Sequence, residues 1–600
     1  MVSSISTETP ADITVLDHSQ LQQIPGVVLD DRLRSIPGFS LFRRSSSLVA
    51  HPTTQGISLR GIGSSGASRT LVLWDGIPAN DPFGGWVYWT QFIPQEMSRI
   101  EVSRGDATSV FGDRAMSGTL ALFSRPPEAR HLLASFEAGN KDTEDATLGY
   151  STIWRDFAFS ANARAFSTEG YFVVPSSIRG AVDRTADVRF ITTDAHIDHY
   201  TTVGNIFINA NILAEERQNG TVLTHNSTGL GTVSLRYERE FTNDTLSISG
   251  FHTREGFHST FSSVAANRNT ERLTYTQTVP SQALGGAALW QHHESFWHLL
   301  AGADVDRLKG FSTDHVFPTG LRQGGGTQLQ HGIFAQADAK FGSARFFGGL
   351  RQSFTGQDSH FVSPSAGVVL GSRRLRLRGS VYRSFRAPTL NELYRQFSVG
   401  NTVTMANAAL RPETLNGAEA GIDLVGEKST FRVTAYRNSL DNLITNVTLS
   451  SSPTQIIRQR ANAAAAHSRG AEAEFQHRFR HWTADFNYLF VDSRYVTGFR
   501  VAQIPKHQGT AQLTYQRGGT LFSLGFRSFD YQFDDDLNTF RLPGYATVEL
   551  LLRQRLSKSL SADLAFNNVL DRTYYTAFTP TPNIGEPRLW RIGFIWDGKL

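Results

Sequence analysis

The sequence lacks cysteine entirely and contains only 4 Met among its 600 residues. The absence of cysteine excludes a disulfide framework, a thiolate metal site and a catalytic thiol, and it suits an oxidising compartment. An excess of charge of one sign is also missing, because 58 Lys and Arg nearly balance 54 Asp and Glu. A nucleic-acid groove needs a basic face, so nucleic acid is not an expected partner.

Long hydrophobic runs are absent as well. No stretch approaches the roughly 20 apolar residues of a transmembrane helix, and the mean hydropathy is −0.26. This excludes helical spans only, because a transmembrane β-strand hides its lipid-facing side chains at every second position. The start MVSSISTETPADITVL shows neither the basic stretch nor the apolar core of a signal peptide, so an exported protein would need a different or processed start.

What the chain does contain is glycine, phenylalanine and a regular alternation of side chains. There are 52 Gly and 42 Phe, and aromatic residues reach 11%. From about residue 130, segments such as FAFSANARAF (157–166), LRLRGSVYR (375–383) and LSADLAFNN (560–568) place apolar residues on one face and hydrophilic residues on the other. This period of two predicts strands with one apolar face.

The turns between these segments are asymmetric. Tight turn signals at Gly371-Ser372, Gly426-Glu427, Gly518-Gly519 and Ser557-Lys558 alternate with long polar loops such as DYQFDDDLNTFRLPG. Short turns at one end and long loops at the other are typical of an outer-membrane barrel. The chain after residue 130 could supply roughly 22 strands of about 10 residues, which would close a barrel wide enough to need a plug.

Residues 1 to about 125 have a different texture and predict a small mixed α/β domain, with a helix in DDRLRSIPG that ends before Pro37-Gly38. The same region spells Gly-x-Gly-x-x-Gly from Gly61 to Gly66. A dinucleotide-binding loop opens a helix, whereas a short β-prone run and a turn follow here. A tight loop between strands is therefore expected.

Together these motifs resemble those of TonB-dependent outer-membrane receptors. The N-terminal part is similar to the family's plug in GISLRGIGSSGASRTLVLWDGIPAND and in SRIEVSRGDATSVFGDRAMSGTLAL, where Asp106 replaces the usual Pro. Farther along, SFRAPTLNELY, LRPETLNGAEAGIDL, HSRGAEAEF and FNNVLDRTYY are similar to family motifs in the expected order. The resemblance covers most of the chain.

The resemblance implies a mostly β protein, an antiparallel transmembrane β-barrel of about 22 strands with a small mixed α/β plug domain in its lumen. The expected division is a periplasmic segment (1–11), a plug (12–127) and a barrel (128–600). The protein would be a monomeric receptor in the lipid of the bacterial outer membrane. Cargo would bind on the extracellular side, and TonB of the inner-membrane energising complex would pull on the N-terminal segment to loosen the plug, without catalysis.

The two ends of the chain depart from the family pattern. The family's TonB box is a short β-like segment before the plug, and the candidate here consists of Val2, Ser3, Ser4 and Ile5. Family barrels usually end on an aromatic residue, whereas Asp597-Gly598-Lys599-Leu600 follows Trp596 here. These four residues are expected to hang beyond the last strand.

Cargo is the least constrained property. The family most often carries ferric siderophores or similar chelates, and the alternative is cobalamin or another large nutrient. FRAP and NAALRPE resemble boxes of haem receptors, but residues 389 to 411 offer no axial His and only Met405 as a ligand, which disfavours haem. A passive gated porin would lack a plug, and a soluble β-rich enzyme or lectin would lack lipid-facing stripes.

Aromatic residues in DPFGGWVYWTQF are candidate ligand contacts, namely Phe83, Trp86, Tyr88 and Trp89. Their rings present large faces, but the alternative is that they pack the plug against the barrel wall, since aromatic residues are mostly core. The run from Asp534 to Asp536 could chelate Ca²⁺, yet consecutive carboxylates on a loop are usually solvated. No metal site and no cofactor are predicted.

Four charged residues are predicted to join plug and barrel. In GAEAGIDL and RGAEAEFQHRF, Glu419 and Glu472 alternate with the apolar positions that face lipid, so they point into the lumen. A carboxylate between plug and wall needs a partner because little water remains to solvate it. Resemblance to the family supplies Arg60 and Arg104 of the plug, and the alternative is water or an Arg of a neighbouring strand.

Overall fold

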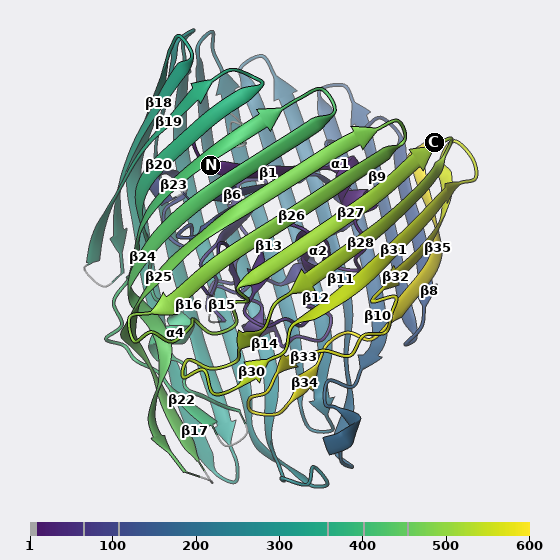
Figure 1. The fold of residues 1–600 in the computed structure, drawn as a ribbon, viewed down its shortest axis with the longest axis vertical. Helices are drawn as coiled ribbons and strands as arrows, with labels where there is room; N and C mark the ends of the chain where they lie inside the picture. The colour runs from purple at the N-terminus through teal and green to yellow at the C-terminus, as the bar shows by residue number, and fades with distance from the viewer. Residues whose placement is uncertain (1–8, 64–65, 106–107, 357–358, 400–401, 453–454) are drawn as a thin grey trace.

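A closed antiparallel barrel of 22 strands forms most of the molecule (Figure 1). The computed structural model describes residues 9–63, 66–105, 108–356, 359–399, 402–452 and 455–600. The wall strands are β8 (His131–Gly139), β9 (Thr143–Trp154), β10 (Phe157–Tyr171), β11 (Asp183–Thr201), β12 (Gly204–Thr221), β13 (His225–Glu240), β14 (Asp244–Val264), β15 (Glu271–His293), β16 (Trp297–Val316), β17 (Gly320–Phe341), β18 (Ala344–Thr355), β19 (Ser359–Gly371), β20 (Leu375–Arg386), β23 (Glu413–Val425), β24 (Ser429–Ser451), β25 (Ile456–Phe479), β26 (Trp482–Tyr495), β27 (His507–Arg517), β28 (Thr520–Phe529), β31 (Tyr545–Arg555), β32 (Leu560–Asn567) and β35 (Leu589–Lys599). The barrel closes because β35 pairs with β8.

The connections have the predicted asymmetry. The four tight turns predicted from the sequence join β19 to β20, β23 to β24, β27 to β28 and β31 to β32, at the upper end in Figure 1. The opposite end carries η4 (Ser176–Ile178), α4 (Leu390–Tyr394) and the hairpins β21 (Phe397–Val399) with β22 (Thr402–Met405), β29 (Gln532–Phe533) with β30 (Arg541–Leu542), and β33 (Tyr575–Ala577) with β34 (Asn583–Ile584). Short turns mark the periplasmic end and long loops the extracellular end.

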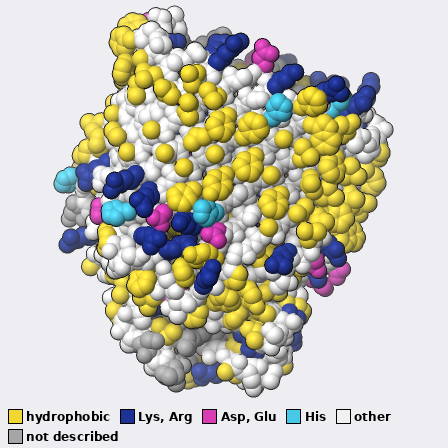
Figure 2. Space-filling view, viewed as in Figure 1, with side chains coloured by type: hydrophobic (Ala, Val, Ile, Leu, Met, Phe, Trp, Pro, Cys, Tyr) yellow, Lys and Arg dark blue, Asp and Glu magenta, His cyan; other side chains and the backbone are white. Residues whose placement is uncertain are grey.

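Alternation along each strand gives the wall two chemically different faces. On β35, Trp590, Ile592 and Phe594 are 40%, 54% and 55% exposed, whereas Arg591 between them is buried. Exposed apolar side chains of this kind form a band across the outer wall (Figure 2). Such a band faces lipid, so the barrel lies in the outer membrane.

Among the helices of the described residues, none is both long enough and apolar enough to cross a membrane.

The C-terminal tail differs from the expectation that it hangs beyond the last strand. Strand β35 continues to Lys599, and Asp597 pairs in register with Leu133 of β8. The Asp597 carboxylate lies 2.6 Å from His131 Nε2 and 3.2 Å from Arg125 Nη1. Because these side chains partner the acid at the edge of the membrane, the charged tail can remain part of the wall.

The plug occupies the barrel lumen (Figure 1). Its five-stranded sheet has the order β1-β6-β7-β4-β5, and β4 runs parallel to β7. Its elements are β1 (Asp12–Asp17), α1 (His18–Gln23), α2 (Leu29–Leu33), β2 (Ser40–Leu41), η1 (Pro52–Thr54), β3 (Ile57–Ser58), β4 (Leu71–Trp74), β5 (Ile77–Pro78), η2 (Trp89–Gln91), η3 (Pro94–Glu96), β6 (Met97–Arg104), α3 (Thr108–Phe111) and β7 (Gly118–Ser124). Helix α2 is the helix predicted in DDRLRSIPG.

The glycine-rich segment after β3 leads to strand β4 and opens no helix in its described part. Gly61 has a φ of 60°, a left-handed conformation that glycine adopts without strain. A Cβ atom at this position would lie 2.7 Å from Val491 Cγ2 of the wall. Glycine at position 61 therefore lets the loop turn tightly and approach the barrel closely.

Candidate functional site

A cluster of buried charges joins one side of the plug to strands β20, β23 and β25. We name it the charged seam, and its members are Asp12, Arg60 and Arg104 of the plug with Arg378, Glu419, Glu472 and Glu474 of the barrel. Arg60 forms a short ion pair with Glu419, and its Nε lies 3.2 Å from Glu472 Oε2. Arg104 Nε lies 3.8 Å from Glu472 Oε1. The structure thus brings together the four residues singled out in the sequence.

Arg104 has a closer partner that the sequence reasoning did not assign to it. Its Nη2 lies 3.0 Å from Glu474 Oε1 and 2.9 Å from the hydroxyl of Thr14. Glu474 shares the lumenal face of β25 with Glu472. The alternation of side chains along β25 could have identified Glu474 as a candidate partner, because it places both carboxylates in the lumen.

Asp12 of strand β1 adds an acidic group from the plug itself to the seam. Its Oδ1 lies 3.5 Å from both Arg104 Nη1 and Arg378 Nη2, and the Thr434 hydroxyl donates to its Oδ2 at 2.7 Å. Burial alone raises the pKa of Asp12, but Arg378, Arg104 and Arg60 outweigh it and hold the pKa below its ordinary value. The sequence signal was an acid at the start of the short strand DITVLD.

The backbone of Arg60 adopts an unusual conformation for a side-chain-bearing residue. Its φ of 54° lies in the left-handed region, which is costly for residues other than glycine. The hydroxyls of Tyr436 and Ser468 each donate to its carbonyl oxygen at 3.2 Å, and its guanidinium stacks 4.9 Å from the Tyr436 ring centroid. The barrel wall therefore holds both the main chain and the side chain of Arg60.

Close approach at the seam also depends on a glycine. Gly105 follows Arg104 with a φ of 89°. A Cβ atom there would lie 2.9 Å from Glu419 Oε2 and 3.0 Å from Arg60 Nη1. Any larger residue would push apart the ion pair on which the seam centres.

The hydrogen bonding of the seam is incomplete. Within the described chain, no hydrogen bond reaches Asp12 Oδ1, Arg60 Nη2, Arg104 Nη1, Arg378 Nη1 or Glu472 Oε1. The side chains that carry these atoms still lie within ion-pair range of opposite charges. A buried ionic network gains little net free energy, because desolvation offsets most of the attraction.

A second ionic network ties the plug to the extracellular end of the wall. Glu413 accepts hydrogen bonds from Arg69 of the plug at 2.9 and 2.6 Å and from Arg386 Nε at 2.7 Å. Arg386 also pairs with Glu392, which closes the capping box of α4 with Thr389. The motifs FRAPTLNELY and LRPETLNG thus complement each other in charge, a relation that the sequence reasoning missed.

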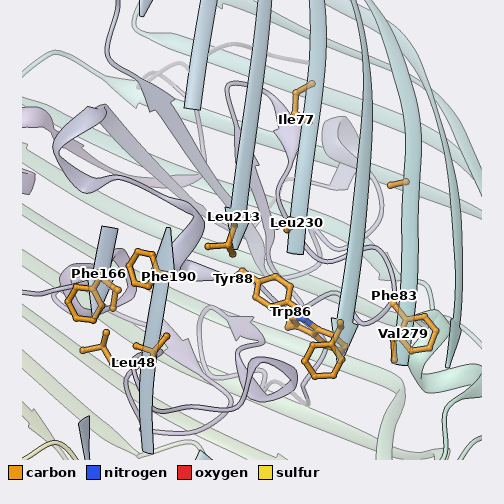
Figure 3. Close-up of a cluster of buried hydrophobic side chains, with 14 of the residues drawn as sticks. Leu48, Ile77, Phe83, Trp86, Tyr88, Phe166, Phe190, Leu213, Leu230 and Val279 are labelled. Carbon is orange, nitrogen blue, oxygen red and sulfur yellow. The ribbon is translucent and has the colours of Figure 1, made fainter. Parts of the chain in front are cut away.

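The opposite side of the plug contacts the wall mainly through apolar side chains, with a hydrogen bond from the Tyr88 hydroxyl to Glu255 Oε1 at 2.5 Å. We name this contact the apolar seam, and it contains Phe83, Trp86 and Tyr88 of the plug (Figure 3). These residues are 0%, 2% and 1% exposed. They pack against wall side chains that include Phe166, Phe190, Leu213, Leu230 and Val279.

Trp89 belongs to a different cluster, in the core of the plug. Its ring centroid lies 5.8 Å from that of Phe39 and 6.0 Å from that of Phe92. In the state that the structure describes, burial leaves none of the four candidate aromatic residues accessible to a ligand. Their positions fit the packing alternative that was weighed from the sequence.

Two buried arginines lie at the extracellular end, beside α4 and the β21–β22 hairpin. Arg395 and Arg460 are 4% and 6% exposed, and their guanidinium groups lie 5.4 and 5.1 Å from the centroid of the Phe397 ring. Arg395 donates to Gln277, and Arg460 donates to main-chain oxygens of Asn391 and Arg395 at 2.7 and 2.8 Å. We name Arg395 and Arg460 the cation pair.

The cation pair carries uncompensated charge. As far as the chain is described, neither guanidinium forms an ion pair with a carboxylate, and Arg395 Nε has no hydrogen-bond partner there. Burial lowers the pKa of Arg395 from its ordinary value, because the charged form is poorly solvated. Both side chains are buried in the state that the structure describes, so an anion would reach them, and relieve both effects, only after the surrounding loops move.

The acidic run at 534–536 has a structural role at its first residue. Asp534 Oδ2 accepts hydrogen bonds from the main-chain N–H groups of Phe578 and Thr579 at 2.8 and 2.7 Å. It joins two extracellular loops, so the expectation of a simply solvated carboxylate was wrong there. Across the described residues, no group of three His, Asp or Glu side chains could hold a metal ion.

A cavity of about 80 Å³ lies between part of the plug and strands β14 to β18. Its lining includes Phe111, Arg114, Asp304, Asp306, Phe334 and Arg351. The plug is therefore not in contact with the wall over its whole circumference.

The candidate TonB-contacting residues Val2 to Ile5 lie outside the described part of the chain.

Comparisons with known proteins agree with this architecture. The family model for the TonB-dependent receptor plug domain matches residues 6–119. An iron-regulated outer membrane virulence protein of Vibrio cholerae is 22% identical over 100% of this chain and 92% of its own length. The solved siderophore receptor PirA of Acinetobacter baumannii has a TM-score of 0.79 at 14% identity, with 98% of each chain covered.

A structure of the copper transporter OprC is equally similar, with a TM-score of 0.81 at 15% identity over 98% of this chain and 99% of that chain. At such identities the likeness to solved structures concerns the fold alone. The family model for the TonB-dependent receptor-like β-barrel matches residues 178–569, well over half of the chain. This protein therefore belongs to the family of TonB-dependent receptors of the bacterial outer membrane.

Proposed function

We propose that this receptor takes up an anionic metal chelate, of the ferric siderophore type, across the outer membrane. The observation that carries the proposal is the cation pair, which places two uncompensated positive charges and an aromatic ring at the extracellular end. Chelates whose oxygen donors leave a net negative charge match this chemistry. A relative described as iron-regulated and a structural neighbour described as a siderophore receptor support iron as the metal.

Energy for uptake has to come from outside the outer membrane. The closed wall satisfies its backbone hydrogen bonds within lipid, and the plug fills the lumen, so cargo passes only when the plug moves. We assign the coupling to TonB, which would pull on the segment before β1, with Val2 to Ile5 as the candidate contact. The work of the protein is binding and translocation, with no chemical step.

The four charged residues predicted from the sequence are assigned the role of seating the plug. Arg60 lies within ion-pair range of both Glu419 and Glu472, and Arg104 lies within ion-pair range of Glu472. The barrel closes within a single chain, which supports a monomer. The proposed division into an N-terminal segment (1–11), a plug (12–127) and a barrel (128–600) follows the change from plug sheet to wall.

Uptake of metal-labelled complexes by cells that express the protein tests the cargo. The probes are a trianionic ferric tris-catecholate, a neutral ferric tris-hydroxamate and cobalamin. We expect uptake of the anionic complex, dependent on TonB, and at least a tenfold loss for the double substitution Arg395→Gln with Arg460→Gln, because charge-assisted hydrogen bonds to the anion disappear. The matched control is Arg189→Gln on the outer wall, whose side chain is 73% exposed.

Three results would contradict the proposal. Preference for cobalamin would shift the cargo to a neutral nutrient. Uptake in cells that lack TonB would favour a passive porin. An unchanged uptake rate in the double variant would remove the cation pair from the binding site.

A further inference from the structure

Basic side chains gather on the outer wall of strands β24 to β26, beyond the extracellular edge of the apolar band (Figure 2). They include Arg437 of β24, Arg469 of β25 and Arg494 of β26, which we name the arginine patch. Each of the three is exposed and has a buried lumenal residue next to it in the chain, so each points outward. The side chains of Arg469 and Arg494 are 73% and 51% exposed.

The register of the strands brings like charges together in this patch. Arg437 lies directly opposite Arg469 across the β24–β25 ladder, an arrangement that is destabilising when no anion separates the two. Arg469 and Arg494 share one carboxylate, that of Asp492, at 3.2 and 2.9 Å. Arg437 forms no ion pair with the described residues, so the patch has an excess of positive charge.

The depth of the patch is set by the length of β25. Phe479, at the periplasmic end of that strand, is 52% exposed and marks one edge of the apolar band, together with Trp482 at the start of β26. Arg469 precedes Phe479 by 10 residues on β25 and so lies closer to the extracellular end. At about 3.3 Å per residue and a tilt of about 40°, this is about 25 Å, the height of the apolar band of such barrels. The patch therefore lies at the level of the outer-leaflet headgroups.

Polar and aromatic side chains of β26 and around the start of β27 continue this boundary. The Tyr488 hydroxyl lies 2.6 Å from His507 Nδ1, and Lys506 Nζ lies 5.5 Å from the centroid of the Phe490 ring. Tyrosine and lysine side chains of this kind place their apolar parts in lipid and their polar ends in the headgroup layer. The neighbourhood of the patch is thus suited to a lipid with a polar head.

We propose that the arginine patch binds a phosphate group of the phosphorylated glycolipid, lipopolysaccharide, that forms the outer leaflet of the outer membrane. A phosphate between Arg437 and Arg469 would replace their repulsion with two charge-assisted contacts, because a guanidinium fork matches phosphate oxygens. This site lies outside the barrel and is independent of cargo and of the plug.

The opposite part of the wall provides a matched control. Arg254 of β14 and Lys309 of β16 both lie opposite Gln282 of β15, which separates them by a whole strand. Arg307 faces outward two residues before Lys309. Arg254 and Arg307 each lie 10 residues from the periplasmic end of their strand, as Arg469 does, but the three cations do not oppose one another directly, so a single phosphate bridges them less well.

Native mass spectrometry of the delipidated full-length receptor tests the site, with diphosphorylated lipid A and dephosphorylated lipid A as probes. We expect the triple substitution Arg437→Gln, Arg469→Gln and Arg494→Gln to weaken binding of diphosphorylated lipid A at least tenfold, because the charge-assisted contacts between the guanidinium forks and the phosphate are lost. The control triple Arg254→Gln, Arg307→Gln and Lys309→Gln should keep the wild-type affinity. Dephosphorylated lipid A should bind weakly to all three proteins.

A second variant separates charge from geometry. Arg437→Lys with Arg469→Lys keeps both charges but loses the fork, so its affinity should lie between those of the wild type and the glutamine triple. Equal binding of phosphorylated and dephosphorylated lipid A would overturn the proposal. An equal loss of affinity in the two triple variants would also overturn the proposal, because basic residues all around the barrel, rather than the arginine patch, would then bind the lipid. Unchanged binding in the lysine and glutamine variants would overturn it as well.

Discussion

The plug meets the barrel through two unlike surfaces. The charged seam joins it to β20, β23 and β25 through buried ions, whereas the apolar seam joins it to β10 to β15 through aromatic and aliphatic side chains. Burial of apolar area stabilises a contact in proportion to the area removed from water. Buried ion pairs stabilise it little, because the cost of desolvating the charges offsets most of their attraction. We infer that the apolar seam holds the plug and the charged seam fixes its position.

The two surfaces also differ in how they open. Ions regain hydration as soon as water enters, so a small displacement is enough to weaken the charged seam. The apolar seam resists until its rings are exposed over a large area. A pull on the N-terminal segment, which leads directly into β1 and Asp12, would therefore reach the easily opened side first.

The largest effect is expected from Arg60→Met. The substitution leaves Glu419 and Glu472 buried without the guanidinium that lies between them, and breaking such a pair costs about 3–5 kcal/mol. Hydrogen exchange of amides in β6 and β7, measured in detergent micelles, reports the opening free energy of the plug. Arg60→Lys, which keeps the charge, should lose less, and equal protection in Arg60→Met and wild type would show that Glu419 and Glu472 do not depend on this guanidinium.

Trp86→Ala should cost about 3 kcal/mol, through lost contacts and a cavity in the apolar seam. The loss should be the same at low and high salt, because no charge is involved, whereas the effect of Arg60→Met should change with salt as water enters. The same exchange measurement applies, with Trp86→Phe as the milder control. A salt-dependent loss in Trp86→Ala would break the contrast between the two seams.

Asp12→Asn should cost about 2 kcal/mol at neutral pH, the value of a hydrogen bond to a charged group. The folded pKa of Asp12 is lowered, so its contribution is present above the unfolded value of about 3.9 and is lost as pH falls through the folded value. The wild-type plug should therefore weaken below about pH 4, and the variant should weaken less there. Identical acid profiles of amide protection would contradict this assignment.

Glu216→Gln should have the smallest effect, at most about 1 kcal/mol. Its pair with Arg189 has the same chemistry as the charged seam, but the side chains of Arg189 and Glu216 are 73% and 57% exposed on the outer wall. Thermal unfolding of the barrel measures the change. A loss as large as that of Arg60→Met would mean that burial is not what distinguishes the two ionic contacts.

Most of the fold could be predicted from local patterns. The period of two predicted the strands and their lipid-facing sides, and the turn residues predicted the periplasmic end. Strands and tight turns can be predicted in this way because they depend on residues that are neighbours in the chain. The alternation of side chains along each strand was enough to place Glu419 and Glu472 in the lumen. Their partners Arg60 and Arg104 came from resemblance to a family, and the structure shows the four residues together.

Other contacts depend on how distant segments meet. The ion pairs of Asp12 with Arg378 and of Arg69 with Glu413 arise only once the plug lies inside the closed wall. Pairing with β8 also decides that Asp597 belongs to a strand. The sequence by itself thus determined the strands, their faces and the two domains, through chemistry repeated along the chain. The tertiary structure alone decided which charges meet and which rings are buried, because barrel closure and the position of the plug set those distances.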